Sequence, residues 1–588
     1  GKNRRRMRLR ATVRQYWSLF SGYLRPQRGR VLVLGLLLFG STGLQLLNPQ
    51  VVRYFIDTAT RAGAADLLVG AAALFLGIAV LQEVAAVLAT YVGENVAWTA
   101  TNSLRRDLAA HCLRLDMSYH NAHTPGELIE RIDGDVSTLA NFFSLFALRV
   151  VGNGLLVVGI LVFLLLEDWR ISLALGLLAM VGIVVLNRLR ELATPHWVRG
   201  RQASANLAGF LEERLAGTED IRANGATPYK MNMLFRLMRD LMQRYRRARV
   251  IGHLGSVLGH FISEMGLAIG LGLGAYLYLE GSMSIGTVYM VSFYAGMLAL
   301  PLRRITDELE DLHKAGATIL RVEELRQTPI AVMDGRGVPL PQAALGVEFD
   351  RVSFGYAVGV PVLRDLSFSL GPGKVLGLLG RTGSGKTTVT RLLLRIYDPD
   401  EGAVRLGGAD LRDLKLGQVR SRVGMVTQEV QLFHASVRDN LTFMNANVPD
   451  ERLLAAIKQL GLTEWYERLP EGLDTKLAPS GGLSAGEAQL LAFTRVFLKD
   501  PSLVILDEAS SRLDPATERL IERAVGRLLE GRTAIIVAHR LGTVQRADEI
   551  MILEQGCILE HGRREQLALD TGSRFSELLR TGMEEALA

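Results

Sequence analysis

A glycine-rich stretch, Gly380-Arg-Thr-Gly-Ser-Gly-Lys-Thr387, has the residue types and spacing of a phosphate-binding loop. Glycines let the backbone curl so that consecutive N–H groups point at a phosphate chain, and the dipole of a following helix adds positive potential. Lys386 can reach the terminal phosphates, and the Thr387 hydroxyl can bind Mg²⁺. An apolar run precedes the stretch and a helical pattern follows it. This order of elements makes a chance glycine turn the weaker interpretation.

Polar side chains also follow three other apolar runs. Asp507 and Glu508 come after one of them, and His539 and Gln428 come after the other two. Ligands of open α/β sheets bind at the carboxyl edge of the strands, where such residues would meet. One carboxylate could hold Mg²⁺, and the next could orient or deprotonate water. Each residue could also be an ordinary polar loop residue, but the nearby phosphate loop favours the catalytic interpretation.

Residues 347–588 therefore resemble the nucleotide-binding domain of ABC transporters. The resemblance implies that Asp507 binds Mg²⁺, that Glu508 is the catalytic base and that His539 contacts the γ-phosphate. It also implies that Gln428 senses Mg²⁺ and the lytic water, and that Asp514 communicates with the opposite site. The implied ATP-binding residues are Tyr356, which would stack on adenine, and the loop residues Gly380, Arg381, Thr382, Gly383, Ser384, Gly385, Lys386, Thr387 and Thr388. An exposed aromatic residue on an antiparallel strand is a common event, so Tyr356 has a structural alternative.

One motif departs from the family. The family signature is LSGGQ, and this chain has Leu483-Ser-Ala-Gly-Glu487. In the family, Ser484 and Gly486 would face the ATP held by a second nucleotide-binding domain. Ser484 and Glu487 also have the spacing of a capping box, which explains both residues without a ligand. A carboxylate repels a triphosphate where an amide would donate to it, and Ala485 adds a Cβ at a point of close approach.

The first half of the chain is predicted to lie in a membrane. The chain has 588 residues, 49% of them apolar, and its mean hydropathy is +0.20. The apolar excess falls into segments of about 20 residues, long enough to cross the hydrocarbon core of a bilayer. Six spans are predicted, at 30–56, 67–90, 141–166, 171–190, 256–279 and 284–305.

Basic residues predict the orientation of these spans. They are frequent before the first span and in the loops at 99–135 and 188–250, and nearly missing from the three short loops between them. The positive-inside rule then places the N-terminus, both long loops and the ATPase domain in the cytoplasm. We expect an integral protein of the inner or plasma membrane whose basic N-terminus contacts lipids rather than nucleic acid. No cleavable signal peptide is predicted.

Short outer loops and long inner loops resemble the type IV, exporter-fold ABC transporters. The resemblance implies helices that extend past the membrane and coupling helices near Met117–Asn121 and Gly217–Ala223. The predicted fold is a six-helix, all-α transmembrane domain followed by an α/β P-loop ATPase domain with an antiparallel β subdomain and a helical subdomain. The predicted domains are a basic N-terminus with an interfacial helix (1–29), a transmembrane domain (30–326), a linker (327–346) and a nucleotide-binding domain (347–588).

Four ionisable residues interrupt the predicted spans: Glu83, Arg149, Arg188 and Glu264. Intramembrane charges usually face protein or water, so these residues could line an inward-facing cavity. They could instead lie at the cytoplasmic headgroups, or Arg149 could form a structural ion pair with a glutamate. The sequence leaves these alternatives open.

The resemblance implies an ATP-hydrolysing half-transporter that exports an amphipathic drug, lipid or peptide by alternating access, with ATP and Mg²⁺ as cofactors. An importer of siderophore-like cargo on the same fold is one alternative. An ATP-gated channel or regulator is another, although the presence of Glu508 and His539 argues against it. The partner would be a second half-transporter. The complete catalytic set beside a degraded signature favours a heterodimer over a homodimer.

Overall fold

The protein is described by a computed structural model over residues 21–61, 63–145, 150–357, 359–428, 430–477, 483–507, 515–538 and 544–581. Its contacts divide the chain into two compact units. The helical unit runs to Leu113 and resumes over Pro125–Thr328, and the sheet unit comprises Arg114–Thr124 and the chain from Pro329. Residues 114–124, which fall within the predicted transmembrane domain, make their contacts with the C-terminal part of the chain, and the predicted linker is grouped with the sheet unit from Pro329. The predicted interfacial helix before residue 21 lies outside the described residues.

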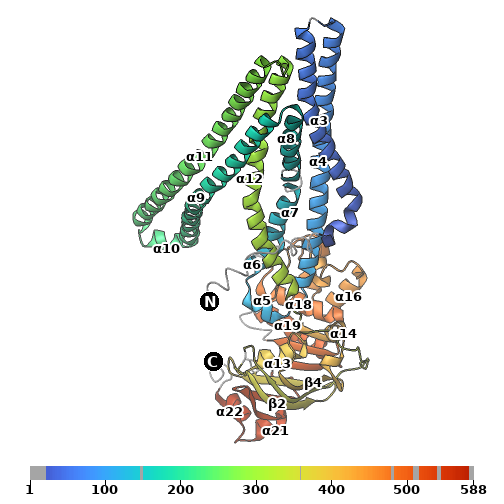
Figure 1. The fold of residues 1–588 in the computed structure, drawn as a ribbon. Helices are drawn as coiled ribbons and strands as arrows, with labels where there is room; N and C mark the ends of the chain where they lie inside the picture. Colours follow the sequence, from blue (N-terminus) through green and yellow to red (C-terminus); the bar gives the residue numbers. More distant parts are fainter. Residues whose placement is uncertain are drawn as a thin grey trace. The chain divides into compact units, whose positions relative to one another are not determined.

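The helical unit consists of long helices packed in pairs. Figure 1 shows α3 beside α4, and α9 beside α11 with the short α10 joining them. Its helices are α3 (Arg28–Thr60), α4 (Ala65–Cys112), α6 (Pro125–Ile129), α7 (Asp135–Leu145), α8 (Gly152–Glu167), α9 (Trp169–Ala216), α10 (Thr218–Ala223), α11 (Thr227–Leu279) and α12 (Ile285–Gln327), with a 3-10 turn at Arg25–Gln27 and a π-helical turn at Glu130–Gly134.

Five of these helices are long and apolar enough to cross a membrane, judged by length and composition over the described residues. They correspond to five of the six predicted spans. The longest has 53 residues, far more than the roughly 20 that a bilayer needs, so these helices continue beyond their apolar segments. The third predicted span, 141–166, includes residues 146–149, which lie outside the described residues, and α8 within it is a shorter apolar helix.

The start of α12 is held by both its own sequence and α3. The Ser284 hydroxyl caps the helix by accepting from the Thr287 amide at 3.1 Å. The Asp57 carboxylate of α3 accepts from the Gly286 amide at 2.9 Å and from the Ser284 hydroxyl at 2.7 Å. A negative charge at a helix N-terminus is favourable. These contacts fix the last turn of α3 against the first turn of α12.

The sheet unit contains two sheets and a group of helices. A four-stranded antiparallel sheet has the order β2-β1-β4-β5, and a mostly parallel six-stranded sheet has the order β10-β9-β3-β8-β7-β6. The strands are β1 (Val347–Phe354), β2 (Leu363–Leu370), β3 (Val375–Gly380), β4 (Glu401–Leu406), β5 (Ala409–Asp410), β6 (Val423–Val426), β7 (Leu503–Asp507), β8 (Thr533–Val537), β9 (Glu549–Glu554) and β10 (Cys557–Arg563).

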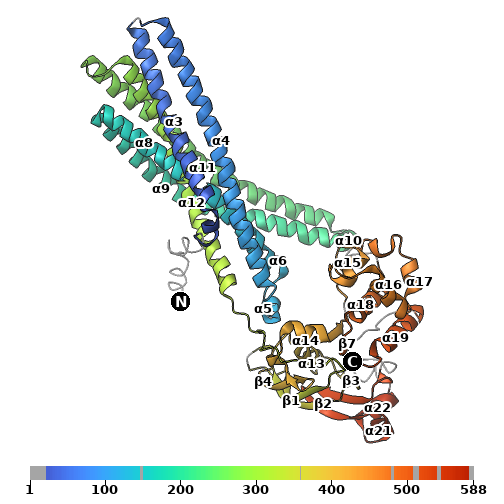
Figure 2. The same cartoon turned by 90° about the vertical axis from the view of Figure 1, so that its right-hand side faces the viewer.

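The helices of this unit begin with α5 (Met117–Ala122), which precedes all the strands in the chain. In Figure 2 the helices α15 to α18 form a group apart from β1, β2 and β4. The other helices are α13 (Lys386–Leu393), α14 (Leu416–Arg422), α15 (Val437–Thr442), α16 (Asp450–Gln459), α17 (Thr463–Glu467), α18 (Ala485–Lys499), α19 (Pro515–Leu529), α21 (Arg564–Leu569) and α22 (Arg574–Thr581), with 3-10 turns at Leu411–Asp413 and Gly472–Asp474.

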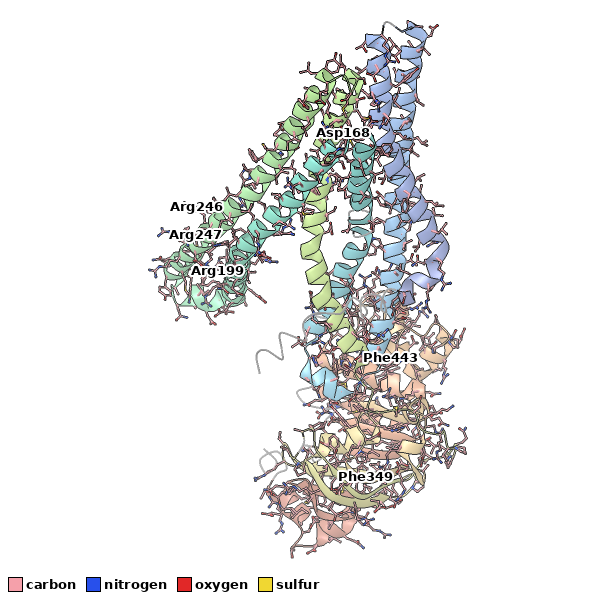
Figure 3. All side chains as sticks on the ribbon, viewed as in Figure 1. Asp168, Arg199, Arg246, Arg247, Phe349 and Phe443 are labelled. Atoms are coloured by element: carbon pink, nitrogen blue, oxygen red, sulfur yellow. The ribbon has the colours of Figure 1, made fainter. Side chains whose placement is uncertain are left out.

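Two hydrophobic cores hold the sheet unit together. One joins the antiparallel sheet to β3 and α13 and includes the stacked rings of Phe349, labelled in Figure 3, and Phe368, whose centroids are 4.7 Å apart. The other joins the group of helices to the parallel sheet. Strand β8 is buried along its whole length, and β7 is buried up to its last residue, as expected for parallel strands covered on both faces. The predicted α/β domain with antiparallel and helical subdomains is confirmed.

Candidate functional sites

The predicted catalytic residues lie at, or directly follow, one edge of the parallel sheet. In the register of the strands, Val537 of β8 pairs with Leu378 of β3 on one side and with Asp507 of β7 on the other. Strand β6 ends at Val426, next to β7. The four strands therefore end level with one another, and the chain leaves each of them at the same carboxyl edge. The prediction that the strand-end residues share one edge requires this parallel register.

The phosphate loop connects β3 to α13 at this edge. Gly380, Gly383 and Gly385 have φ values of +148°, +82° and +107°, which side-chain-bearing residues rarely adopt. Helix α13 begins at Lys386, whose side chain is only 6% exposed. Its ammonium donates to the carbonyls of Gly380 and, at 3.1 Å, Arg381. The loop thus wraps around its own lysine and opens directly onto a helix N-terminus.

Two observations show that this loop fits a phosphate chain. The Ser384 Oγ is buried and has no hydrogen-bond partner among the described residues, so a polar group is available inside the loop. A Cβ added at Gly380 would lie 2.6 Å from that same Oγ and would also meet the Leu553 carbonyl. The close backbone path therefore requires glycine, as it does wherever backbone amides must approach a ligand.

Tyr356 lies beside the phosphate loop. Its hydroxyl is 3.1 Å from Thr388 Oγ1 and accepts from Arg391 Nη1 at 3.0 Å. Tyr356 is 41% exposed, and the Arg391 guanidinium lies over its ring with its central carbon 5.7 Å from the centroid. The ring also meets Phe354 and Tyr397 edge-on, with centroids 5.1 and 5.3 Å away. A planar base can stack on such an exposed, fixed ring.

The remaining predicted site residues divide into two groups. Gln428 is exposed two residues after β6, and Asp507 is half-buried as the last residue of β7. Glu508, Asp514 and His539 lie outside the described residues. The described residues that precede Glu508 and His539, which are Asp507 and Ala538, are at the same edge as the phosphate loop.

The altered signature forms the capping box that its spacing predicts. The Ser484 Oγ accepts from the Glu487 amide at 3.3 Å, and the Glu487 carboxylate accepts from the Ser484 amide at 2.8 Å. Ser484 is exposed at the start of α18, and Gly486 is buried. The Glu487 carboxylate is therefore directed back at its own helix N-terminus. This contact explains the glutamate locally and leaves the Ser484 side chain at the surface.

The helical unit contains a cleft of about 850 Å³ between α9, α11 and α12, here called the basic cavity. Four of its lining residues are arginines, and among the described residues that line it none is acidic. It lies where the predicted apolar spans of these three helices give way to their charged extensions. The lining residues are Leu186, Leu189, Arg190, Ala193, Thr194, Trp197, Arg201, Tyr245, Arg249, Ile251, Gly252, His253, Gly255, Ser256 and Arg303.

Two aromatic rings form a wall of the basic cavity. Trp197 of α9 and Tyr245 of α11 meet edge to face with centroids 5.9 Å apart. A Cβ at Gly252 would lie 3.3 Å from Trp197 Nε1, and one at Gly200 would lie 3.6 Å from the Tyr245 ring. Each glycine therefore leaves space for the aromatic ring of the facing helix. Figure 3 shows further positive charge on the same helices at Arg199, Arg246 and Arg247, which extends the basic surface beyond the cavity.

Three of the four ionisable residues that interrupt the predicted spans are described by the structure. The side chains of Glu83, Arg188 and Glu264 are exposed in the helical unit. Arg188 pairs with Glu191 of its own helix at 3.4 Å. Arg149 lies outside the described residues. Their contact with cargo stays a prediction.

The basic cavity has no counterpart among the features predicted from the sequence. Arg190 and Arg249 fall in the basic loop at 188–250, and Arg303 falls within the sixth predicted span. Their convergence depends on how three helices pack. Gly200 and Gly252 are a weak sequence signal that two helices pack closely. In the structure each lies against an aromatic residue of the facing helix, but the spacing of residues within one helix does not identify that aromatic residue.

A helical, membrane-spanning unit joined to a phosphate-loop unit defines an ATP-driven membrane transporter, and comparison with known proteins identifies the family. Residues 31–302 match the family described as the ABC transporter transmembrane region, and residues 363–511 match the family described as ABC transporter. The chain belongs to the ABC transporter family. It has the type IV exporter fold of a half-transporter, it is an integral membrane protein, and it couples ATP hydrolysis to transport.

Similar proteins include exporters and lipid flippases. The ATP-dependent lipid A-core flippase of Idiomarina loihiensis is 30% identical over 94% of this chain and 96% of its own length. The protein of the same description from Alcanivorax borkumensis is 29% identical over 98% of this chain and 97% of its own length. A solved bacterial Atm1-family ABC exporter with ATP bound has a TM-score of 0.79 at 25% identity, covering 94% of this chain and 98% of that one.

Proposed function

We propose that this chain exports an anionic amphiphile of the lipid class, taken up from the inner leaflet of the membrane. The observation that carries the proposal is the basic cavity, where arginines and aromatic rings line one cleft. Guanidinium groups pair well with phosphate or carboxylate. The apolar residues Leu186, Leu189 and Ile251 in the same lining would accept the start of an acyl chain.

The relatives support a lipid as cargo. Two similar proteins are described as flippases of lipid A-core, a cargo that is anionic and amphipathic. The basic cavity lies at the ends of apolar segments, which is where a lipid headgroup would enter from the bilayer. Four arginines converge on one cleft whose described lining contains no acidic residue, and this excess of positive charge favours a ligand of opposite charge.

The ATP site would act through residues of the phosphate-loop edge. The loop amides and Lys386 would bind the phosphate chain, and Tyr356 would stack on the base. Glu508 would take a proton from the attacking water, with His539 and Gln428 orienting the reacting groups. Ser484 and Gly486 of one chain would face the nucleotide of the partner, and Asp514 would communicate with that opposite site.

Side chains with oxygen atoms that would bind Mg²⁺ lie at the same edge. The Thr387 hydroxyl, the Asp507 carboxylate and the Gln428 amide oxygen are of the hard, oxygen type that this ion takes. Bound Mg²⁺ would neutralise charge on the phosphate chain. The orientation that follows from the basic loops puts the ATPase domain and the N-terminus in the cytoplasm.

Neutralising the basic cavity should weaken the response to anionic lipid. We expect Arg249→Gln combined with Arg303→Gln to raise the phosphatidic acid concentration for half-maximal ATPase stimulation by about tenfold or more, since charge-assisted hydrogen bonds contribute about 1.5–3 kcal/mol each. The measurement is ATPase activity of the reconstituted protein titrated with phosphatidic acid. Arg244→Gln is the matched control, because Arg244 lies on α11 outside the lining of the cavity and pairs with Asp240 at 2.8 Å.

The comparison with a zwitterionic lipid tests the charge requirement. Phosphatidylcholine should stimulate ATPase activity only weakly, and to the same extent in all variants. Equal stimulation of wild-type protein by both lipids would contradict the proposal. Net movement of fluorescent phosphatidic acid toward the ATPase side of proteoliposomes would favour the importer, and ATP-dependent ion current without lipid movement would favour the channel.

Exporters of this fold work as dimers, and we propose a heterodimer for this chain. The observation behind it is the Glu487 carboxylate, which occupies its own helix N-terminus, where a partner's phosphate would otherwise approach the dipole. This chain's catalytic set would then pair with a complete signature from the partner. Its own signature would cover a slow site.

The test of the heterodimer is the activity of this chain purified alone. We expect it to hydrolyse ATP at least about tenfold more slowly than the complex with its partner, because losing one set of phosphate contacts costs more than about 1.4 kcal/mol. In the complex, Glu487→Gln should change the rate of ATP hydrolysis at the slow site and leave the rate at the fast site nearly unchanged. Lipid-stimulated turnover of the single chain at the rate of the complex would contradict the heterodimer.

A further inference from the structure

A row of contacts inside the sheet unit leads from the phosphate loop to α5. Helix α5 belongs to the sheet unit, whereas the helices that precede and follow it in the chain, α4 and α6, belong to the helical unit. It is therefore a covalent part of the loop between two helices of the membrane unit. Any residue that ties α5 to the nucleotide site can connect ATP binding with that loop.

Tyr397 occupies this position. The Asn121 amide of α5 donates to the Tyr397 hydroxyl at 3.2 Å, and the two residues are 276 positions apart in the chain. Tyr397 is only 7% exposed. Burial, followed by the nearby Tyr356, raises the pKa of Tyr397, so its hydroxyl stays neutral and available as an acceptor at physiological pH.

The Tyr397 ring continues the contacts toward the nucleotide site. It meets the Tyr356 ring at 80° with centroids 5.3 Å apart and the Phe354 ring with centroids 5.4 Å apart. Tyr356 in turn contacts Thr388, which follows the phosphate loop. Each of the three rings touches the other two, and a closely packed ring cluster transmits displacement because close-packed side chains have little free volume.

The turn that carries Tyr397 is also fixed. Arg395 has the left-handed φ of +49° and is almost completely buried. Its guanidinium pairs with Asp398 at 2.9 Å and donates to the carbonyls of Leu414 and Met333 at 3.0 and 2.8 Å. The turn next to Tyr397 is thus held in place, and the Asn121 contact is the end of the row at α5.

We propose that Tyr397 is a positioning residue that couples stacking of the nucleotide base on Tyr356 to the ordering of α5. This rests on the proposed role of Tyr356 as the base-binding residue. A base stacked on Tyr356 restricts that ring, the ring restricts Tyr397, and the Tyr397 hydroxyl holds Asn121. Base recognition then has a route to α5 that does not pass through the phosphates.

The test is hydrogen–deuterium exchange of the full-length dimer in lipid nanodiscs, with ATP or inorganic tripolyphosphate, which has no base. In wild-type protein ATP should slow exchange in both the phosphate loop and α5, by at least about fivefold in α5. Tripolyphosphate should protect the loop and leave α5 unchanged. In Tyr397→Phe, ATP should still protect the loop, but its protection of α5 should be lost.

Three further measurements make the result decisive. Asn121→Ala should match Tyr397→Phe, and the double variant should show no additional loss, because both changes remove the same contact. Tyr466→Phe, a change of the same kind on α17, should behave as wild type. Undiminished protection of α5 in Tyr397→Phe, or equal protection of α5 by tripolyphosphate, overturns the coupling role. A phosphate loop that ATP does not protect in wild-type protein overturns the nucleotide-site assignment itself, and the two failures are distinguishable.

Discussion

Replacing Glu508 with glutamine is expected to abolish ATP turnover while ATP binding persists. Glu508 follows Asp507, which ends a buried strand at the phosphate-loop edge. Glutamine keeps the shape of the side chain but cannot accept the proton of an attacking water. Loss of a general base lowers turnover by about a hundredfold or more. The phosphate-loop contacts are unchanged, so the variant should accumulate with ATP bound.

The measurements are steady-state ATPase activity and retention of labelled ATP after rapid gel filtration. Glu522→Gln is the matched control, because Glu522 is an exposed carboxylate on α19 and should leave both quantities unchanged. A Glu508→Gln variant that hydrolyses ATP within a few-fold of the wild-type rate would show that another group activates the water.

Replacing Lys386 with alanine should abolish turnover for the opposite reason, by removing ATP binding. The Lys386 ammonium is buried within the loop and bonded to the carbonyls of Gly380 and Arg381, so its charge is directed at the position of the phosphate chain. Hydrogen bonds to charged groups contribute about 1.5–3 kcal/mol, so we expect an increase in the dissociation constant for ATP of about ten- to a hundredfold.

Equilibrium binding of a fluorescent ATP analogue to the purified transporter measures this constant. Lys374→Ala is the control: Lys374 begins the same strand–loop segment but is exposed and pairs with Asp548 at 3.6 Å. Thermal unfolding distinguishes lost binding from lost folding, because removing the ammonium leaves two loop carbonyls without their donor. Unchanged affinity in a folded Lys386→Ala variant would exclude a phosphate-binding role for this residue.

Much of this protein could be predicted from the sequence because the decisive signals are local. The phosphate loop is a strand, a turn and a helix in one continuous segment, and its three left-handed glycines are required by the backbone path of that segment alone. The capping box at Ser484 and Glu487 spans four residues and forms as its spacing predicts. Apolar segments of membrane length identify spans for the same reason: hydrophobicity needs no knowledge of neighbours.

Other features had no local signal. The sequence placed the residues 114–124 in the membrane domain, and only their contacts show that they belong to the sheet unit. Chain continuity groups residues 114–124 with the membrane helices on either side of them. The hydrogen bonds of Asp116 and Asn121 to residues hundreds of positions away group them with the sheet unit instead. Whether Glu83, Arg188 and Glu264 line a cavity has no local signal either, since counting residues along a helix gives depth but not direction around the helix axis.

By itself, the sequence determined the family, the two-part architecture, the phosphate loop and the strand-end residues, because each depends on residue type and spacing within a short segment. The tertiary structure alone decided which distant side chains meet: Trp197 with Tyr245, four arginines around one cleft, and Tyr397 between Tyr356 and Asn121. These side-chain contacts depend on the register and rotation with which whole helices and sheets pack. The same apolar pattern is compatible with many registers, and close packing of the side chains selects one of them.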